Sequence, residues 1–352
     1  MGKIGVNVCG QGQGPIVAVG GGSGPSLVAR ALSSELERLA AVVCTTDRGS
    51  STGACRRLFH MPAPGDMRAT LSTMAELSGQ EAWALVLERR LRCEGNSDLD
   101  GMALGNLILA GLFQEEKDLG RAVFRLASLL GVCGRVLPVT AESSDLAARL
   151  EDGSVVRGEV EVRRVGKPPI VELGWVGEPP RPAPGVLESL GQADLILLGP
   201  GCLYTSLLPC LLVKGVAEAI RHRRGTCIYI CNTTTTPGQT DGFSAARHVR
   251  EVVRVLGQGG LDGVLLHQGA VPRETIASYE PLGVLPLEVT QEDLKEIRSM
   301  GVRHWLFPLT ESPSASPRIL HKVDTIRHDP LKLGQALREI CREVGVSLTI
   351  TT

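Results

Sequence analysis

The sequence predicts an α/β fold: a Rossmann-like, mostly parallel sheet with helices on both faces and a small antiparallel β insertion. Short apolar runs alternate with helical patterns along most of the 352 residues, as in parallel strands joined by crossover helices. Gly- or Thr-rich polar segments directly follow four of the apolar runs. One stretch instead alternates in polarity around Asp152-Gly153, which is a strong hairpin turn signal.

Seven apolar runs are predicted as the strands of the main sheet. They are PIVAVGG (15–21), AAVVCTT (40–46), GRVLPVT (134–140), DLILLG (194–199), TCIYIC (226–231), DGVLLH (262–267) and VRHWLF (302–307).

Helical periodicity predicts the connections between these strands. The helical stretches are SLVARALSSELERLA (26–40), DMRATLSTMAEL (66–77), EAWALVLERRLR (81–92), LGNLILAGLF (104–113), LGRAVFRLASLL (119–130), GVAEAIRHRR (215–224), SAARHVREVVRVL (244–256) and DPLKLGQALREICREV (329–344). The segment 145–162 is predicted to form a β-hairpin, and the Pro-rich stretch 168–185 is predicted to form a loop. We therefore expect an N-terminal extension (1–13) and a single domain (14–350) with a β-hairpin insertion near 145–180.

The composition excludes several classes of protein. The 37 Lys and Arg residues balance 38 Asp and Glu residues to a net charge of −1, and aromatic residues make up 3% of the chain. Such a chain lacks the basic field and the stacking surfaces of nucleic-acid-binding proteins. No apolar run approaches the roughly 20 residues that cross a bilayer, and the start shows no signal-peptide pattern. We expect a cytoplasmic protein without a membrane span and without a nucleic-acid partner.

Neither the cysteines nor the histidines are spaced as metal ligands. The ten cysteines are dispersed and form no CxxC pair, and the seven histidines include no HExxH motif. Most of the cysteines are therefore interpreted as small core residues in a reducing compartment. We expect no dedicated metal site.

The glycine-rich segment after the first strand is the first candidate ligand-binding element. Gly20 to Ser26 combines glycines that let a ligand approach the backbone with Ser23 as an expected helix cap and Pro25 in the first helical turn. Backbone N–H groups at a helix start can hold a phosphate. The segment matches neither GxGxxG nor a P-loop, and a tight strand-to-helix connection is an equally good interpretation.

The segments after the second strand add charged and hydroxyl groups. Asp47 stands where an acidic residue of a Rossmann fold would contact a ribose hydroxyl, or where it would cap the next helix. Ser51 offers a hydroxyl group. Further on, Asp66 can cap a helix, and Arg68 can either face a phosphate or form a surface pair with Asp66.

Two later segments follow apolar strands in the same way. Gly199-Pro200-Gly201 precedes Ser206 in a second glycine-and-hydroxyl segment. Asn232 ends a strand before four threonines, and its amide suits uracil or sugar hydroxyls. Asp241 is interpreted by default as a cap of the helix that follows, with an acid or a metal ligand as alternatives. His328 is interpreted as part of a helix-start cluster rather than a site residue.

Together these segments resemble the gluconeogenesis factor family (YvcK-like), itself related to the 2-phospho-L-lactate transferase (CofD) family. The resemblance runs from Pro15 to about Val344. It is carried by IVAVGGGSGPSLVARAL, TTDRGSSTG, PAPGDMRATL, LGNLILAGL, GRVLPVTAESSDLAARLEDGSVVRGE, ADLILLGPGCLYTSLLPCLLVKGVAEAI, ICNTTTTPGQTDGFSAARHV and IRHDPLKL. Because TTDRGSSTG lacks the second acidic residue of the transferase branch, the resemblance favours the gluconeogenesis-factor branch.

The resemblance implies a set of ligand-binding residues at the strand ends. They are Gly21, Gly22, Ser23, Gly24, Asp47, Ser51, Gly65, Asp66, Arg68, Gly105, Asn106, Gly199, Gly201, Ser206, Asn232, Pro237, Gly238 and Asp241. Three positions depart from the family pattern. Arg48 replaces a small or acidic residue, Ala69 an Asn, and Met102 a residue that is often His.

Two functions are compatible with these residues. The first, which the resemblance implies, is a non-catalytic regulator that binds a UDP-sugar or dinucleotide. It would act in cell shape and wall synthesis during gluconeogenic growth, together with protein partners. Whether the protein forms a homo-oligomer is left open. The second is a transferase that moves a phospho-group from a nucleotide-diphosphate donor to a hydroxyl acceptor. Asp47 or Asp241 would then be the catalytic candidate and would hold Mg²⁺ or activate the hydroxyl. Mg²⁺ is expected only with this second function; the regulator requires no cofactor. A structural protein with a vestigial pocket is a third alternative.

Overall fold

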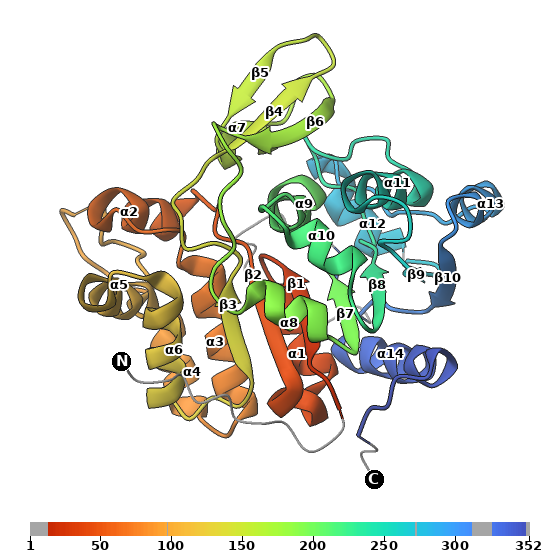
Figure 1. Cartoon of the computed structure of the whole chain (residues 1–352). Helices are drawn as coiled ribbons and strands as arrows, with labels where there is room; N and C mark the ends of the chain where they lie inside the picture. Colours follow the sequence, from red (N-terminus) through yellow and green to blue (C-terminus); the bar gives the residue numbers. More distant parts are fainter. Residues whose placement is uncertain (1–12, 97, 272, 312–325, 350–352) are drawn as a thin grey trace.

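A seven-stranded parallel sheet forms the centre of the molecule (Figure 1). The computed structural model describes residues 13–96, 98–271, 273–311 and 326–349. The strand order is β10-β9-β8-β7-β1-β2-β3. The bounds are β1 Ile16–Gly20, β2 Leu39–Val43, β3 Arg135–Pro138, β7 Leu195–Leu198, β8 Thr226–Ile230, β9 Gly263–His267 and β10 Arg303–Phe307. Every one of the seven predicted strand segments is therefore confirmed. The expected N-terminal extension lies outside the described residues except for Gln13.

The direction in which strands are added reverses beside β1. From β1 the chain moves to β2 and β3 on one side, and it later returns to pair β7 with the other side of β1. In such a sheet, ligands bind at the carboxyl ends of the strands where the order reverses. The topology thus favours the loops after β1, β2, β7 and β8 as the site.

Alternating side chains of β1 serve two separate cores. Ile16 and Ala18 face one core, which includes residues of α1, α3 and α14. Val17 and Val19 face the other, which includes residues of α8 to α11 and α13. Because neighbouring side chains of a strand point to opposite faces, this division confirms that helices cover both faces of the sheet.

The eight predicted helical segments are found as α1, α3, α4, α5, α6, α10, α11 and α14, with differences in their ends. Helices α2, α8, α9, α12 and α13 were not among the predicted segments, and α7 begins inside the segment 145–162 that we predicted as a hairpin, so the hairpin is shorter than predicted. The bounds are α1 Gly24–Ala31, η1 Ser33–Arg38, α2 Ser50–Phe59, α3 Gly65–Leu77, α4 Glu81–Glu88, α5 Leu104–Glu116, α6 Leu119–Leu129, α7 Glu159–Arg163, α8 Val186–Gln192, η2 Leu203–Leu207, α9 Leu208–Leu211, α10 Val216–Arg221, α11 Ala245–Leu256, α12 Arg273–Tyr279, η3 Glu280–Leu282, α13 Gln291–Ser299 and α14 Pro330–Val344. The predicted helix 26–40 is wrong in length. It ends at Ala31, Leu32 leaves helical geometry, and a 3₁₀ turn leads into β2. No helix of the described ranges is long and apolar enough to cross a membrane.

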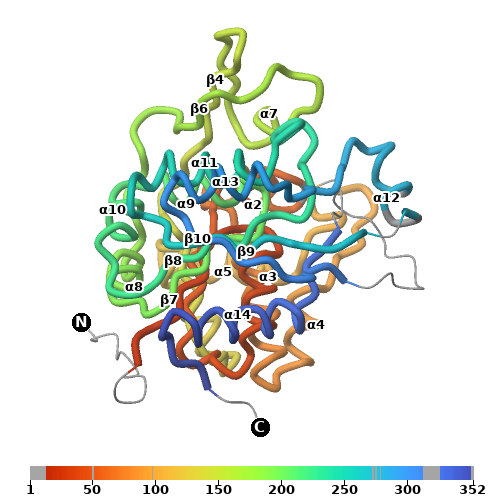
Figure 2. The backbone as a smooth tube through the Cα atoms, turned by 90° about the vertical axis from the view of Figure 1, so that its right-hand side faces the viewer, coloured from red at the N-terminus to blue at the C-terminus, as the bar shows by residue number. Residues whose placement is uncertain are grey.

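The predicted antiparallel insertion forms a three-stranded sheet of order β5-β4-β6. Its strands are β4 Leu146–Leu150, β5 Val155–Arg157 and β6 Ile170–Trp175. Gly153 adopts a φ of +83° in the predicted turn between β4 and β5, which suits glycine. The third strand, β6, comes from a stretch that we predicted as a loop, so that interpretation was wrong. In both views the insertion stands at the opposite end of the molecule from α14 (Figure 1, Figure 2).

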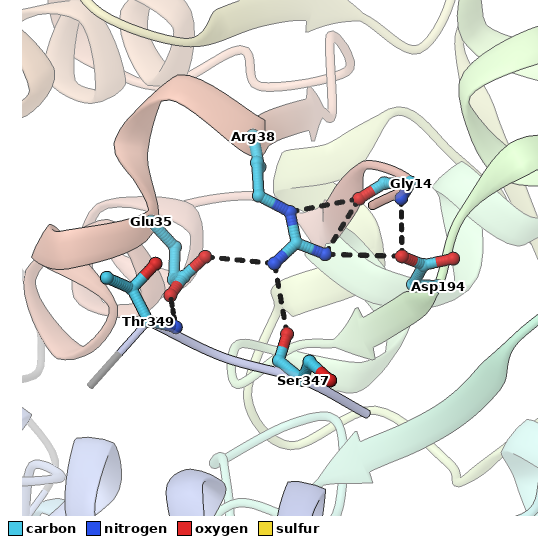
Figure 3. Close-up of polar contacts among 6 residues, drawn as sticks. All are labelled: Gly14, Glu35, Arg38, Asp194, Ser347 and Thr349. Atoms are coloured by element: carbon cyan, nitrogen blue, oxygen red, sulfur yellow. Dashed lines mark hydrogen bonds and ion pairs between the residues drawn. The ribbon is translucent and has the colours of Figure 1, made fainter. Parts of the chain in front are cut away.

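A buried ion pair ties distant segments together at the amino end of the sheet (Figure 3). The Arg38 guanidinium donates to the carbonyls of Gly14 and Ser347 and to the carboxylates of Glu35 and Asp194. The side chains of Arg38 and Glu35 are only 7% and 1% exposed. This cluster therefore joins the start of β1, the start of β7 and the segment after α14.

We expect Arg38→Ala to lower the free energy of unfolding by about 3–5 kcal/mol, because the substitution leaves Glu35 buried without its cation. Urea denaturation measures this change. Arg30→Ala provides the matched control, since Arg30 pairs with Glu76 at the surface; such pairs contribute about 1 kcal/mol or less. Equal effects of the two substitutions would contradict the prediction.

Candidate ligand-binding site

The turn between β1 and α1 is closely packed against two other segments. A methyl group at Gly24 would overlap the carbonyl oxygen of Pro200, and one at Gly21 would lie 2.9 Å from Asp66 Oδ2 and 3.3 Å from Ser206 Cβ. Gly22 has a φ of +60° and donates its N–H to Asp66 Oδ2 at 2.6 Å. Glycine is therefore needed here for close approach.

Ser23 lies at the N-cap position of α1, but its side chain makes no capping hydrogen bond. Its backbone is already in the right-handed helical region (φ −86°, ψ −6°), whereas a capping residue usually has extended geometry. The expectation of a Ser23 cap was wrong. Pro25 does lie in the first turn, as predicted. The Ser23 side chain is instead exposed at the turn.

The segments after β7 and β8 meet this turn from the other side. Gly201 donates its N–H to Asn232 Oδ1 at 3.4 Å, and a methyl group at Gly201 would lie 3.3 Å from the carbonyl oxygen of Gly21. Gly199 has a φ of +75°, which favours glycine. The structure thus brings together predicted residues from the ends of β1, β7 and β8.

Asp47 lies beside the start of α3. Its Oδ1 accepts the N–H of Gly49 at 2.9 Å, and Gly49, rather than Asp47, is the N-cap residue of α2. The capping alternative for Asp47 was therefore wrong. A methyl group at Gly65 would lie 3.7 Å from Asp47 Oδ2 and would overlap the hydroxyl of Thr52. Gly65 thereby allows α2, Asp47 and the first turn of α3 to meet.

The predicted residues of α3 and α5 form a polar cluster around Ser51. Arg68 is 7% exposed and pairs with Glu88, so the predicted surface pair with Asp66 was wrong. Asn106 is 1% exposed and donates to the Ser51 hydroxyl at 3.1 Å. A methyl group at Gly105 would lie 2.8 Å from Arg68 Cγ. Glycine at that position makes room for the arginine.

Arg90 joins the same cluster and was missed by the sequence analysis. Its Nη1 donates to the Ser51 hydroxyl at 3.1 Å. Burial lowers the pKa of Arg90, and the nearby charge of Arg68 lowers it further. The sequence gives little signal for this role, because Arg90 lies in a predicted helix (81–92) that actually ends at Glu88.

Asp66 and Asp241 do not cap helices as expected. Asp66 is the second residue of α3, whose N-cap residue is Pro64. Asp241 Oδ2 accepts the N–H of Gly238 at 2.7 Å, while Ser244 caps α11. Both carboxylates instead accept backbone N–H groups of glycine turns. A methyl group at Gly283 would lie 3.6 Å from Pro237 Cγ, so the loop after β8 packs against the turn at Gly283.

His328 reaches the carboxyl end of β8, contrary to its interpretation as part of a helix-start cluster. Its Nε2–H donates to the carbonyl of Cys231 at 3.1 Å, and its side chain is buried. Burial lowers its pKa to about 4. The neighbouring Asp329 caps α14, which carries His328 to the sheet edge.

Two of the three family departures are explained by their contacts. Arg48 forms an ion pair with Asp145 at the start of the insertion. Met102 is buried and accepts from the thiol of Cys55 at 3.6 Å. At the third position, the backbone carbonyl of Ala69 accepts from Ser26 at 3.4 Å, a contact that does not depend on the side chain.

Several buried polar atoms at this edge have no hydrogen-bond partner among the residues that the structure describes. They are Arg68 Nε, Asn106 Oδ1, Thr234 Oγ1 and Gln239 Nε2. An unpaired buried polar group costs about 1–3 kcal/mol, and such groups are generally satisfied by a ligand, a water molecule or an ion. No group of three or more His, Cys, Asp or Glu residues that could hold a metal occurs within the described ranges. The nitrogen donors of Arg68 and Gln239 suit oxygen acceptors of a ligand.

Comparisons with known proteins agree on one family. The family model described as 2-phospho-L-lactate transferase CofD matches residues 16–309. A gluconeogenesis factor of Bacillus subtilis is 34% identical over 333 residues, covering 94% of this chain and all of that protein. A putative gluconeogenesis factor of Thermotoga maritima is 36% identical and covers 93% of this chain and 99% of its own length. The crystal structure of a UPF0052 family protein from Bacillus halodurans superimposes with a TM-score of 0.83 at 32% identity, over 94% of this chain and all of that one.

We expect the stability of the protein to fall as the pH decreases from about 6.5 towards 4, partly because of His328. An unfolded histidine has a pKa near 6.5, whereas the buried one titrates at about 4. The unfolded state therefore binds more protons in this range than the folded state does. The neutral His328 contributes about 3 kcal/mol to the free energy of unfolding above pH 6.5, and this contribution is progressively lost as the pH falls towards 4. Urea unfolding between pH 7 and pH 4.5 measures the slope. His328→Gln, which can still donate to Cys231, should flatten the slope; an unchanged slope would refute the assignment.

Proposed function

This chain belongs to the CofD family, and we propose that it is a nucleotide-sugar-binding regulator of the gluconeogenesis-factor type. Its gluconeogenesis-factor relatives match over nearly the whole chain, which favours this function over a transferase. In this proposal the protein acts in the cytoplasm, binds a UDP-sugar or dinucleotide, and influences cell shape and wall synthesis during gluconeogenic growth through protein partners.

The observation that carries this proposal is the set of unpaired buried polar groups at the carboxyl edge. Arg68 Nε is a donor and Asn106 Oδ1 an acceptor, and both are withdrawn from water without a hydrogen-bond partner in the described part of the chain. A phosphate satisfies the first group and a sugar or base N–H or O–H the second. The same edge is where ligands bind in sheets of this topology.

The phosphates fit best near Arg68, Arg90 and Ser51. The N–H of Gly22 already donates to Asp66, so the carboxylate occupies the position that a phosphate on the glycine turn would need. Ser51, Arg68 and Asn106 lie in the first turns of α2, α3 and α5, whose N-terminal ends favour negative charge. Asp47 and Asn232 then contact sugar or base hydroxyls, and the glycine turn provides close packing.

Binding of UDP-sugars and dinucleotides to the purified protein, measured by isothermal titration calorimetry, tests the proposal. We expect Asn106→Leu to weaken binding at least about tenfold, because it removes the acceptor Asn106 Oδ1. The free energy of unfolding should change by about 1 kcal/mol or less, since the lost bond to Ser51 is offset by the removal of the unpaired Oδ1. Absence of binding by every compound in the panel, with the fold intact, would rule out the proposal. So would unchanged affinity in the variant.

A transferase is the second candidate, favoured by the description of the family model. A methyl group at Gly65 would lie 3.7 Å from Asp47 Oδ2, which places this carboxylate at the start of α3. Mg²⁺ is commonly held by one or two carboxylates together with substrate phosphates, and Asp47 is the carboxylate that would supply such a ligand here. When bound, it would neutralise phosphate charge during transfer.

Metal-dependent turnover of a nucleotide-diphosphate donor distinguishes the two functions. If the protein is a transferase, Asp47→Asn should abolish that turnover without abolishing the binding of the donor. Turnover that persists in the variant would exclude Asp47 as the catalytic residue. Absence of turnover in the wild type would favour the regulator.

A further inference from the structure

A line of buried polar groups connects three loops of the carboxyl edge. Cys44 Sγ, just after β2, lies 3.1 Å from the Thr46 hydroxyl and 3.7 Å from the carbonyl oxygen of Thr205 in η2. The Thr205 hydroxyl in turn donates to Gln239 Oε1 at 3.3 Å. Gln239 belongs to the loop after β8, and all four residues are buried. The loops after β2, β7 and β8 are therefore joined by side chains as well as by the sheet.

The same line of polar groups touches the glycine turn. A methyl group at Gly21 would lie 2.9 Å from Cys44 Cβ and 3.3 Å from Ser206 Cβ. Thr205, which holds the amide of Gln239, is the chain neighbour of Ser206. These contacts place Gln239 one residue away from side chains that pack on the glycine turn.

The loop that carries Gln239 is held in place by its threonines. The Thr235 hydroxyl accepts the N–H of Leu285 at 3.1 Å, and the Thr240 hydroxyl accepts the N–H of Thr236 at 2.8 Å. The backbone N–H of Gln239 donates to the carbonyl of Thr236 at 3.0 Å. The backbone from which the Gln239 side chain extends is therefore fixed before a ligand binds.

The amide of Gln239 is bonded through its oxygen. Thr205 donates to Oε1, whereas Nε2 is buried and has no hydrogen-bond partner in the described ranges. An amide nitrogen carries two N–H donors. Leaving such a buried group unpaired costs about 1–3 kcal/mol, and an acceptor on a ligand would remove this cost. Since the nitrogen can only donate, its ligand partner must be an acceptor.

The surroundings of Gln239 favour an uncharged acceptor over a phosphate. The segment between β8 and α11 contains no Lys or Arg. Gly238, which precedes Gln239, donates its N–H to Asp241 Oδ2 at 2.7 Å, and its carbonyl accepts from Lys167. These two charges balance, so this loop offers no surplus positive charge to a phosphate, unlike the arginines around Ser51. A carbonyl oxygen needs no such charge.

We propose that Gln239 is a specificity-determining residue of the carboxyl-edge site, and that its Nε2 donates to a carbonyl oxygen of the base of the ligand. This inference rests on the proposed function and deepens it, because it assigns the base of the ligand to the loop after β8 and favours uracil. Uracil carries two ring carbonyl oxygens, whereas adenine carries none and presents an amino group instead. An amide nitrogen that can only donate therefore discriminates between the two bases.

Titration calorimetry of the full chain with UDP and with ADP tests this role, because the two compounds share the diphosphate and differ in the base. We expect the wild type to bind UDP more tightly than ADP. Gln239→Met has a similar volume but no donor, so it should raise the Kd for UDP about 5- to 30-fold and that for ADP by less than about threefold. The salt dependence of the Kd should stay unchanged, since the lost contact carries no charge.

Gln268→Met is the matched control. It makes the same substitution at a glutamine directly after β9 whose side chain is exposed. Both Kd values should stay within about threefold of the wild-type values, because an exposed side chain without a role in binding can be replaced at little cost.

A second variant of Gln239 separates binding from folding. The carboxylate of Gln239→Glu can still accept from Thr205 but offers no nitrogen donor, so we expect a folded protein that binds UDP no better than Gln239→Met. Circular dichroism and thermal unfolding verify the fold of each variant.

Three outcomes would contradict the inference. It is overturned if the folded Gln239 variants bind UDP as tightly as Gln268→Met, or if the wild type binds ADP as tightly as UDP. It is also overturned if the variants lose ADP as strongly as UDP, because the role of Gln239 would then be structural. If the wild type binds neither compound, the proposed function itself fails, and the inference fails with it.

Discussion

The close approach of the β1–α1 turn to the segment after β7 is the constraint on which the carboxyl edge depends. A side chain at Gly24 would overlap the carbonyl oxygen of Pro200, and methyl groups at Gly21 and Gly201 would lie only 3.3 Å from Ser206 Cβ and from the Gly21 carbonyl oxygen, respectively. Asp66 adds the first turn of α3 by accepting the N–H of Gly22. Parallel pairing of β1 with both β2 and β7 brings these segments to one edge of the sheet, and they can touch because the glycines carry no side chains. This contact positions the N-terminal ends of α1 and α3.

The two ends of the sheet differ in how their buried polar groups are satisfied. At the amino end, the Arg38 guanidinium donates to four different residues, and Glu35 also accepts from the backbone of Thr349. At the carboxyl end, Arg68 Nε and Asn106 Oδ1 have no partner among the described residues. Satisfied networks stabilise a fold, whereas unsatisfied groups reduce stability and are commonly retained for function. The amino end therefore contributes to stability, and the carboxyl end is the place where the proposed ligand would be bound.

The strands could be predicted from the sequence because each is a short apolar run; β1, β2 and β9, for example, are buried along their whole length. The caps could not, because the partner of a short polar side chain is decided by tertiary structure. Asp66 accepts an N–H from a residue 44 positions away, and no local pattern encodes that bond. The same holds for His328, which meets Cys231 across 97 positions. Arg90 was not identified as a site residue because the sequence placed it inside a predicted helix, whereas α4 ends at Glu88 and Arg90 donates to Ser51.

The packing of α14 has a consequence for the order in which the protein is completed during synthesis. Gly334 of α14 lies against the carbonyl of Ala31 at the end of α1, and the backbone of Ser347 contacts Arg38. On the ribosome, α1 and the apolar face of β1 therefore emerge some 300 residues before the helix that covers them. Until then only α3 and its neighbours can cover that face, and the part that α14 covers stays exposed to water and to other nascent chains. The contacts of α14 with α1 and of Ser347 with Arg38 are therefore among the last to form.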